Sequence, residues 1–139
     1  SNARHLGNQA INFGFDLQCG VSNVIFRQRT TSGLETNTYS GLTIASNSWV
    51  IIAFVYDSSG PTSTLYVDGV KQGTPKSLNG TQTWTGSAFP LALACNGSSL
   101  TVCRTCRWDL VRFWEKVLVQ DDIDNLYNEG NGLAYSEFD

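Results

Sequence analysis

The sequence predicts an all-β protein, built as a sandwich of two antiparallel sheets with one short helix near its C-terminal end. Three observations support this prediction. Several short segments alternate apolar and polar residues, and polar turns rich in Gly, Ser, Thr and Asn separate them. The one convincing helical pattern comes late, at 120–130. The chain has 139 residues, which is enough for one domain with a buried core.

The composition limits the classes of function. Charged residues make up 15% of the chain and the net charge is −3, with no basic cluster, so nucleic acid is not an expected partner. No apolar stretch is long enough to span a bilayer, so we expect no membrane insertion. Residues 1–3, Ser-Asn-Ala, look like the remnant of an expression tag. We therefore expect residues 4–139 to form a single domain.

The first half of the chain shows three strand-like segments. Residues 11–19 alternate strictly, with apolar side chains at the odd positions, which predicts a strand with one buried face. A turn is predicted at 20–23 and a second strand at 24–29. The polar run TTSGLETNT, 30–38, is predicted to be a loop. Residues 49–56, WVIIAFVY, are apolar on both faces and predict a central strand that is covered on both sides.

A tight hairpin is predicted at 64–73, TLYVDGVKQG. Asp68 and Gly69 stand between strand-like residues. A type I′ turn needs positive φ at both of its central positions, which Asp tolerates and Gly adopts freely.

The remaining chain predicts two further strands and the helix. Residues 91–95 predict a strand, NGSS a turn, and 101–114 a long strand whose apolar residues change parity between Leu110 and Val111. Either a β-bulge near this point lets both sets face the core, or both faces are partly buried. In QDDIDNLYNEG, apolar residues three and four apart predict a helix that ends near Gly130.

Three stretches together resemble the laminin-G-like, concanavalin A-like domains: SNSWVIIAFVYDSSGPTSTLYVDGV, FPLALAC and RWDLVRFWEKVLVQDDIDNLYNEGNG. The first is similar to the family's Trp-strand-Tyr-Asp and Leu-Tyr-Val-Asp-Gly pattern. The last resembles its closing strand, short helix and Leu-Tyr-x-x-Gly ending. The resemblance covers residues 11–132 and implies that the sandwich is a jelly roll.

The chain also departs from the family pattern. Val119 stands where a Ser or Thr would cap the helix, so we expect the capping box to be lost. Family members carry further strands before a segment like 11–19. Either this chain is a fragment that lacks the N-terminal strands, or they are supplied otherwise. A missing strand would leave an open sheet edge, so we expect a homodimer, or contact of that edge with the rest of a larger chain.

An enzyme is not the expected function. Glucanases of the same superfold need two carboxylates facing one groove, usually at alternate positions of a strand. None of the four Glu residues stands in an alternating acidic strand pattern; they are Glu35, Glu115, Glu129 and Glu137. The single His5 lies in a terminus expected to fray, so a Ser-His-Asp arrangement has no obvious base.

The four cysteines leave three interpretations open. The favoured one is a disulfide between Cys95 and Cys103 across the NGSS turn, with a second between Cys19 and Cys106 if the first and last strands are neighbours. Buried thiols are the main alternative. A zinc site is the least favoured, because residues three apart in a strand point to opposite faces.

Candidate binding residues follow from the chemistry of sugar recognition, which combines a flat aromatic ring with amide or carboxylate groups. They are Trp84, Tyr39, Asn79 and Asn96, where both aromatics are expected in loops and both asparagines also fit the glycosylation pattern. Packing is the alternative role of each aromatic, and we assign Trp49 and Trp114 to packing. The resemblance implies calcium at loop acids, which makes Asp57 a candidate ligand. Its alternative role is to cap a turn.

The leading hypothesis is a non-catalytic recognition module that binds carbohydrate, such as a surface glycan. We expect it within a larger extracellular, cell-surface or virion protein. This choice of ligand class depends on fold-level analogy. A structural or adhesion domain that contacts only protein is the alternative, and a degenerate glycoside hydrolase is the third hypothesis.

Overall fold

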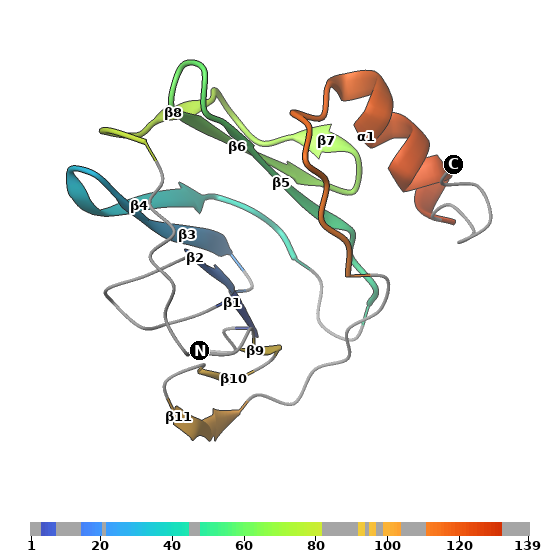
Figure 1. The fold of residues 1–139 in the computed structure, drawn as a ribbon. Coiled ribbons are helices and arrows are strands. Elements are labelled where there is room, and N and C mark those ends of the chain that lie inside the picture. The colour runs from blue at the N-terminus through green and yellow to red at the C-terminus, as the bar shows by residue number, and fades with distance from the viewer. Residues whose placement is uncertain are drawn as a thin grey trace. The chain divides into compact units, whose positions relative to one another are not determined.

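The structure is a computed structural model. It describes residues 4–7, 15–20, 22–44, 48–81, 92–93, 95–96, 99–103 and 111–131 (Figure 1). The chain divides into two compact units, each made of two separate segments. Unit 1 contains Ser1–Ser46 and Leu78–Arg112, and unit 2 contains Asn47–Ser77 and Phe113–Asp139. Every described strand pairing is antiparallel, and the one described α-helix is short and lies near the C-terminal end.

Unit 1 contains a sheet with the strand order β4-β3-β2-β1-β9 and a separate β10–β11 hairpin (Figure 1). The bounds are β1 Arg4–Gly7, β2 Phe15–Cys19, β3 Asn23–Thr30, β4 Gly33–Ser40, β9 Ala92–Leu93, β10 Cys95–Asn96 and β11 Ser99–Cys103. The predicted turn before β3 is confirmed, because the Gly20 N–H donates to the Asn23 carbonyl at 2.8 Å. The described part of the predicted first strand is β2.

Alternation forms the buried face of this sheet. In β3 every second residue is buried, beginning with Val24 and Phe26. The register places Leu17 opposite Phe26 and Cys19 opposite Val24, and all four side chains are buried. The rings of Phe15 and Phe26 also stack, with centroids 6.3 Å apart. Period-two burial of this kind fixes the register, because a slip by one residue would expose the whole apolar set.

The prediction of a loop at 30–38 is wrong. These residues form the tight turn at Thr31 and Ser32 and most of strand β4, which pairs with β3 along its full length. The strand was hidden because both of its faces are polar and only Tyr39 is buried. β4 is the last strand in the described sheet order, so polar side chains on it stay solvated. Its threonines are β-branched and suit a strand.

Strand β1 was not anticipated. The sequence analysis expected residues 4–7 to fray, but they pair with β2 on one side and with β9 on the other. The register places Arg4 opposite Cys19, and Leu6 opposite both Leu17 and Leu93. β2 therefore has a partner on each side. A four-residue strand is too short to produce a readable alternation.

Unit 2 contains the sheet β5-β6-β7, in which β8 also pairs with β6. The bounds are β5 Ile52–Asp57, β6 Thr62–Val67, β7 Val70–Lys71 and β8 Lys76–Ser77, followed by helix α1 Gln120–Tyr127 and the 3-10 turn η1 Asn128–Gly130. β5 was predicted to be a central strand, but among the described strands it pairs with β6 only. Trp49 was predicted to pack within this strand; it precedes β5 and is 66% exposed, so that prediction is wrong.

The predicted hairpin is confirmed. Asp68 and Gly69 both have positive φ, 49° and 78°, and they join β6 to β7. The Asp68 carboxylate also accepts a hydrogen bond from the Ile51 N–H at 2.9 Å, and the Asp68 N–H donates to the Ile51 carbonyl at 2.9 Å. The turn is therefore fastened to the residue that precedes β5.

Helix α1 is held by apolar contacts on the sheet of unit 2. Ile123 packs in a cluster with Val55, Tyr66 and Leu118, and the partly buried Ala53 and Leu126 pack against this cluster. A helix of eight residues is marginal alone, so these contacts stabilise it. The helix ends before the predicted glycine, because Asn128 adopts the left-handed conformation and its N–H donates to the Asp124 carbonyl.

The start of α1 corrects the expected loss of the capping box. Val119 has no side-chain acceptor, so one half of the box is absent. The other half remains, because Asp122 Oδ2 accepts a hydrogen bond from the Val119 N–H at 3.0 Å. Asp122 Oδ1 also accepts from Lys116 Nζ at 2.8 Å.

We expect Asp122 to make the stability of α1 sensitive to acid. The hydrogen bond from Lys116, and next that from the Val119 N–H, lower the pKa of Asp122 below its ordinary value of 3.8. A carboxyl group with a lowered pKa stabilises the fold above its unfolded pKa, and this contribution is lost as the pH falls through the lowered pKa. Asp122→Asn should therefore flatten the loss of stability below about pH 4, measured as the urea midpoint against pH. Asp121→Asn in the same turn is the control, and identical profiles for the two variants would contradict the prediction.

The predicted strand at 101–114 is confirmed at 101–103 and wrong at 111–114. β11 ends at Cys103, and residues 111–114 are not in a strand. Trp114 was therefore wrongly placed in a strand, and it is exposed, with 40% of its surface accessible. Residues 104–110, with the predicted bulge, lie outside the described residues.

Candidate functional site

The predicted binding residues do not gather in one place within the described chain. Tyr39 was predicted in a loop, but it lies in β4 with only 3% of its surface exposed, so it offers no face to a ligand. Asn79 is exposed and follows β8, and Asn96 lies in β10. Trp84 lies outside the described residues. The ligand-binding roles of Trp84, Asn79 and Asn96 stay predictions.

Asn79 belongs to a short segment that is fastened to the β3–β4 hairpin. Its carbonyl accepts a hydrogen bond from Thr30 Oγ1 at 2.6 Å, and the Thr31 N–H donates to the Thr81 carbonyl at 2.9 Å. Asn79 Nδ2 donates to Glu35 Oε2 at 3.4 Å. Gly80 has a φ of 77°, and a Cβ there would collide with the Thr31 hydroxyl. This packing positions the backbone and leaves Asn79 at the surface.

Asp57 caps a turn in this structure. Its Oδ1 accepts hydrogen bonds from the Ser59 N–H at 2.8 Å and the Ser59 hydroxyl at 2.7 Å. The bond from the Ser59 hydroxyl is the main cause that lowers the pKa of Asp57. Calcium takes six to eight oxygen ligands, and no group of three or more acids, His or Cys able to hold a metal occurs among the described residues. Calcium at Asp57 stays a prediction that this local geometry does not favour.

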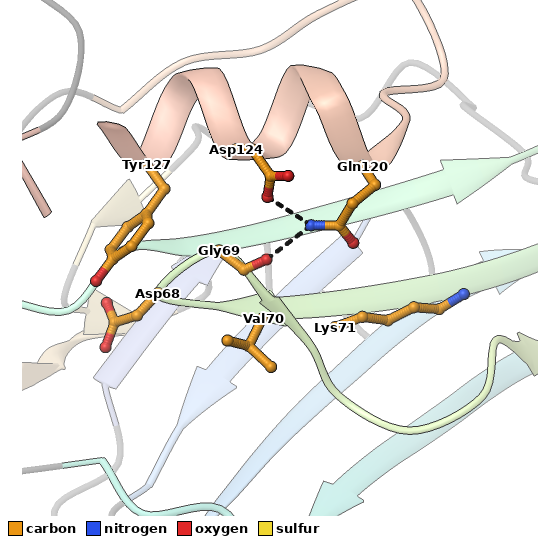
Figure 2. A pocket seen from close by; sticks show the side chains of 7 residues that line it. All are labelled: Asp68, Gly69, Val70, Lys71, Gln120, Asp124 and Tyr127. Atoms are coloured by element: carbon orange, nitrogen blue, oxygen red, sulfur yellow. Dashed lines mark hydrogen bonds between the residues drawn. The ribbon is translucent and has the colours of Figure 1, made fainter. Parts of the chain in front are cut away.

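An open groove lies between the β6–β7 turn and helix α1 in unit 2. Figure 2 shows the residues that line it: Asp68, Gly69, Val70, Lys71, Gln120, Asp124 and Tyr127. Its volume is about 400 Å³, within the range of small-molecule sites. The turn supplies the floor and the helix supplies one wall.

Gln120 joins the two sides of the groove. Its Nε2 donates to the Gly69 carbonyl at 2.9 Å and to Asp124 Oδ1 at 2.7 Å, as the dashed lines in Figure 2 show. The Tyr127 ring lies directly against Gly69, where an added Cβ would be only 2.9 Å from the ring carbon Cδ1. The close approach of turn and helix therefore depends on a glycine at position 69.

The groove presents an aromatic ring together with charged groups. Tyr127 and Asp68 lie toward one end and Lys71 toward the other, with Asp124 between them on the helix (Figure 2). Asp68 and Asp124 each use Oδ1 in a protein hydrogen bond, and no partner for either Oδ2 occurs among the described residues. These groups can accept and donate hydrogen bonds to a polar ligand whose apolar face lies on the ring.

Sequence reasoning missed this site. It identified the Asp68-Gly69 turn and the helix separately, each as a structural element. Their meeting depends on a contact between residues 51 positions apart, and no local pattern signals such a contact.

Formal charge is distributed unevenly between the two units. By sequence, unit 1 has six basic and three acidic residues, and unit 2 has three basic and nine acidic residues. The net charges are therefore +3 and −6, which together give the −3 of the whole chain. The groove lies in the acidic unit, so its surroundings favour neutral or cationic ligands over anionic ones.

No described helix is long and apolar enough to cross a membrane. A family model described as the concanavalin A-like lectin/glucanases superfamily matches residues 2–124. A solved structure of an S-layer domain-containing protein from Clostridium thermocellum is similar at 21% identity, with a TM-score of 0.42. The match covers 85% of this chain and 58% of that one. A comparison with curated proteins gives no match.

Proposed function

This chain belongs to the concanavalin A-like lectin/glucanases superfamily, and from this premise we propose that it is a non-catalytic module that binds carbohydrate in the groove of unit 2. Membership confirms the predicted resemblance and, with the antiparallel sheets and the one short α-helix among the described residues, the predicted sandwich class. The observation that carries the proposal is the groove itself, which combines the Tyr127 ring with hydrogen-bonding groups on both sides.

The chemistry of these side chains suits a sugar. A pyranose ring has a face of C–H groups that can lie on the Tyr127 ring, while its hydroxyls point outward at the edge. The Oδ2 atoms of Asp68 and Asp124 can accept hydrogen bonds from hydroxyls, and Lys71 Nζ can donate to them. The groove is open, which is compatible with one unit of a longer glycan chain.

The environments of several carboxylates support a non-catalytic role. A glycosidase needs an acid whose pKa is raised, so that it is protonated near neutral pH. Hydrogen bonds lower the pKa of both Asp57 and Asp122. The buried Asp16 pairs with Arg27 at 2.9 Å and accepts from Gln18 at 2.8 Å. Each of these three acids is engaged by a structural partner.

The first test is a glycan array, repeated with a calcium chelator. We expect binding to neutral or amine-bearing glycans and weak signals for sulfated or uronic-acid glycans, because the charge of unit 2 opposes anions. Asp124→Asn should weaken binding of the best glycan by about tenfold, equivalent to the loss of one hydrogen bond to a charged group. The measurement is isothermal titration calorimetry.

The matched control is Asp121→Asn, which makes the same charge change on the same helix outside the groove. It should leave the dissociation constant almost unchanged. An equal loss in both variants would indicate a general charge effect, and no loss in either would remove the groove from the proposal. Loss of binding on chelation would instead favour the calcium prediction.

Protein contact is the second candidate function, and one observation favours it. The segment before α1 exposes several large apolar side chains, with Phe113 62% and Val119 59% exposed. Such side chains are enriched in protein interfaces. An array with no glycan signal, together with a concentration-dependent dimer in sedimentation, would favour an adhesion or assembly role. We place either function on an extracellular or cell-surface protein.

A further inference from the structure

We infer that Cys95 and Cys103 form a disulfide that closes the β10–β11 hairpin. The two strands are antiparallel, and the register places Cys95 directly opposite Cys103, with a register shift between Cys95 and Asn96. Residues directly opposite in an antiparallel pair have Cα atoms about 4.5 or 5.5 Å apart. A disulfide requires a Cα separation of about 4.4–6.8 Å. Residues paired in this way therefore lie within the range that a disulfide can span.

Cys19 lies in β2, in a different sheet from Cys95 and Cys103. Arg4 of β1 lies opposite Cys19, and β9 lies on the other side of β1. β10 begins two residues after β9 and also contacts β1. β1 therefore lies between β2, which contains Cys19, and β9, so β2 and β9 are two strand spacings or about 9.6 Å apart, beyond the limit of about 7 Å for a disulfide. Cys95 and Cys103 belong to the separate β10–β11 pair, which contacts β1 and β9.

This geometry favours one of the three possible pairings of four cysteines. Two of the pairings need Cys19 bonded to Cys95 or to Cys103, which lie in a different sheet. The third contains Cys95–Cys103, the pair that the register places opposite each other. Cys106 lies outside the described residues, so a bond between it and the buried Cys19 stays a prediction.

The reaction needs an oxidant of the dithiol/disulfide class. The two thiols give up two electrons and two protons, an S–S bond forms between Cys95 and Cys103, and the disulfide of the oxidant is reduced to two thiols. Such oxidants act in compartments outside the reducing cytosol. The inference therefore also predicts where the chain folds, independently of any ligand in the groove.

The test is peptide mapping of the full chain after export to an oxidising compartment, with free thiols alkylated before digestion. Cleavage at Leu100 by chymotrypsin and at Arg104 by trypsin separates all three late cysteines. We expect a cross-linked pair of peptides that contains Cys95 and Cys103 and disappears on reduction. Alkylation of both residues, a Cys95–Cys106 link, or stoichiometric zinc in the intact protein would overturn the inference.

Thermal unfolding provides a second readout. Cys95→Ser, Cys103→Ser and the double variant should lower Tm by a similar amount, roughly 5–10 °C, because all three remove the same bond. Cys106→Ser should leave the Cys95–Cys103 cross-link intact. Additive losses in the double variant would indicate two separately packed thiols and would contradict the disulfide. Glycan binding should be unchanged in all these variants, since the groove lies in unit 2.

Discussion

Replacing Ile123 by alanine is expected to lower the free energy of unfolding by about 2–5 kcal/mol. Ile123 is the buried residue of α1, with 2% of its surface exposed, and it packs against Val55, Tyr66 and Leu118. Truncation removes three carbon atoms from this cluster and leaves a cavity beside β5 and β6. The helix has little stability of its own, so the loss should also detach it from the sheet.

Urea unfolding monitored by tryptophan fluorescence measures this effect. The matched control is Val117→Ala, which truncates an exposed β-branched residue close to the same helix. It should cost less than about 0.5 kcal/mol. Equal losses in the two variants would show that the helix does not depend on the buried cluster.

The second large effect is expected for Gly69→Ala. Gly69 has a φ of 78°, where an L-residue costs about 1–2 kcal/mol. The added Cβ would also press on the Tyr127 ring, at 2.9 Å from Cδ1. Gly73→Ala is a close control, because Gly73 has a φ of 70° with no atom within 4 Å of the new Cβ. We expect Gly73→Ala to show the backbone cost alone and Gly69→Ala to show a larger loss, in urea unfolding.

A double variant identifies the source of the extra loss. Tyr127→Ala in the Gly69→Ala background removes the ring that the Cβ meets, so the combined loss should be smaller than the sum of the two single losses. If the two stability losses were strictly additive, the Tyr127 ring would not be the cause of the extra loss in Gly69→Ala. Because Tyr127 lines the groove, Gly69→Ala should also weaken glycan binding, and Gly73→Ala should not.

The elements that were predictable from sequence are those that local chemistry specifies. Asp68 and Gly69 predict a turn, because few residues tolerate positive φ. The spacing of Ile123 and Leu126 predicts the helix. β4 was not predictable because polar residues occupy both of its faces. The exposure of Trp49 was equally hidden, since an apolar run does not show where its strand begins.

Local sequence patterns could not predict the groove, for a different reason. It needs the Gln120 amide at the Gly69 carbonyl, a contact that only the tertiary fold creates. The cysteines show an intermediate case. Sequence spacing suggested the Cys95–Cys103 pair across a turn, and the strand register places these two residues opposite each other.

The two-segment construction of both units has a consequence for synthesis on the ribosome. Leu6 pairs with Leu93, so β1 cannot pair with β9 until most of the chain has been synthesised. The β5–β6 hairpin is made early, but the residues that cover Val55 and Tyr66 are Leu118 and Ile123, which are translated after the whole second segment of unit 1. Neither unit can therefore complete its folding until its second segment has been synthesised. The apolar strands of both units stay uncovered through much of elongation, and during this interval the nascent chain needs chaperones.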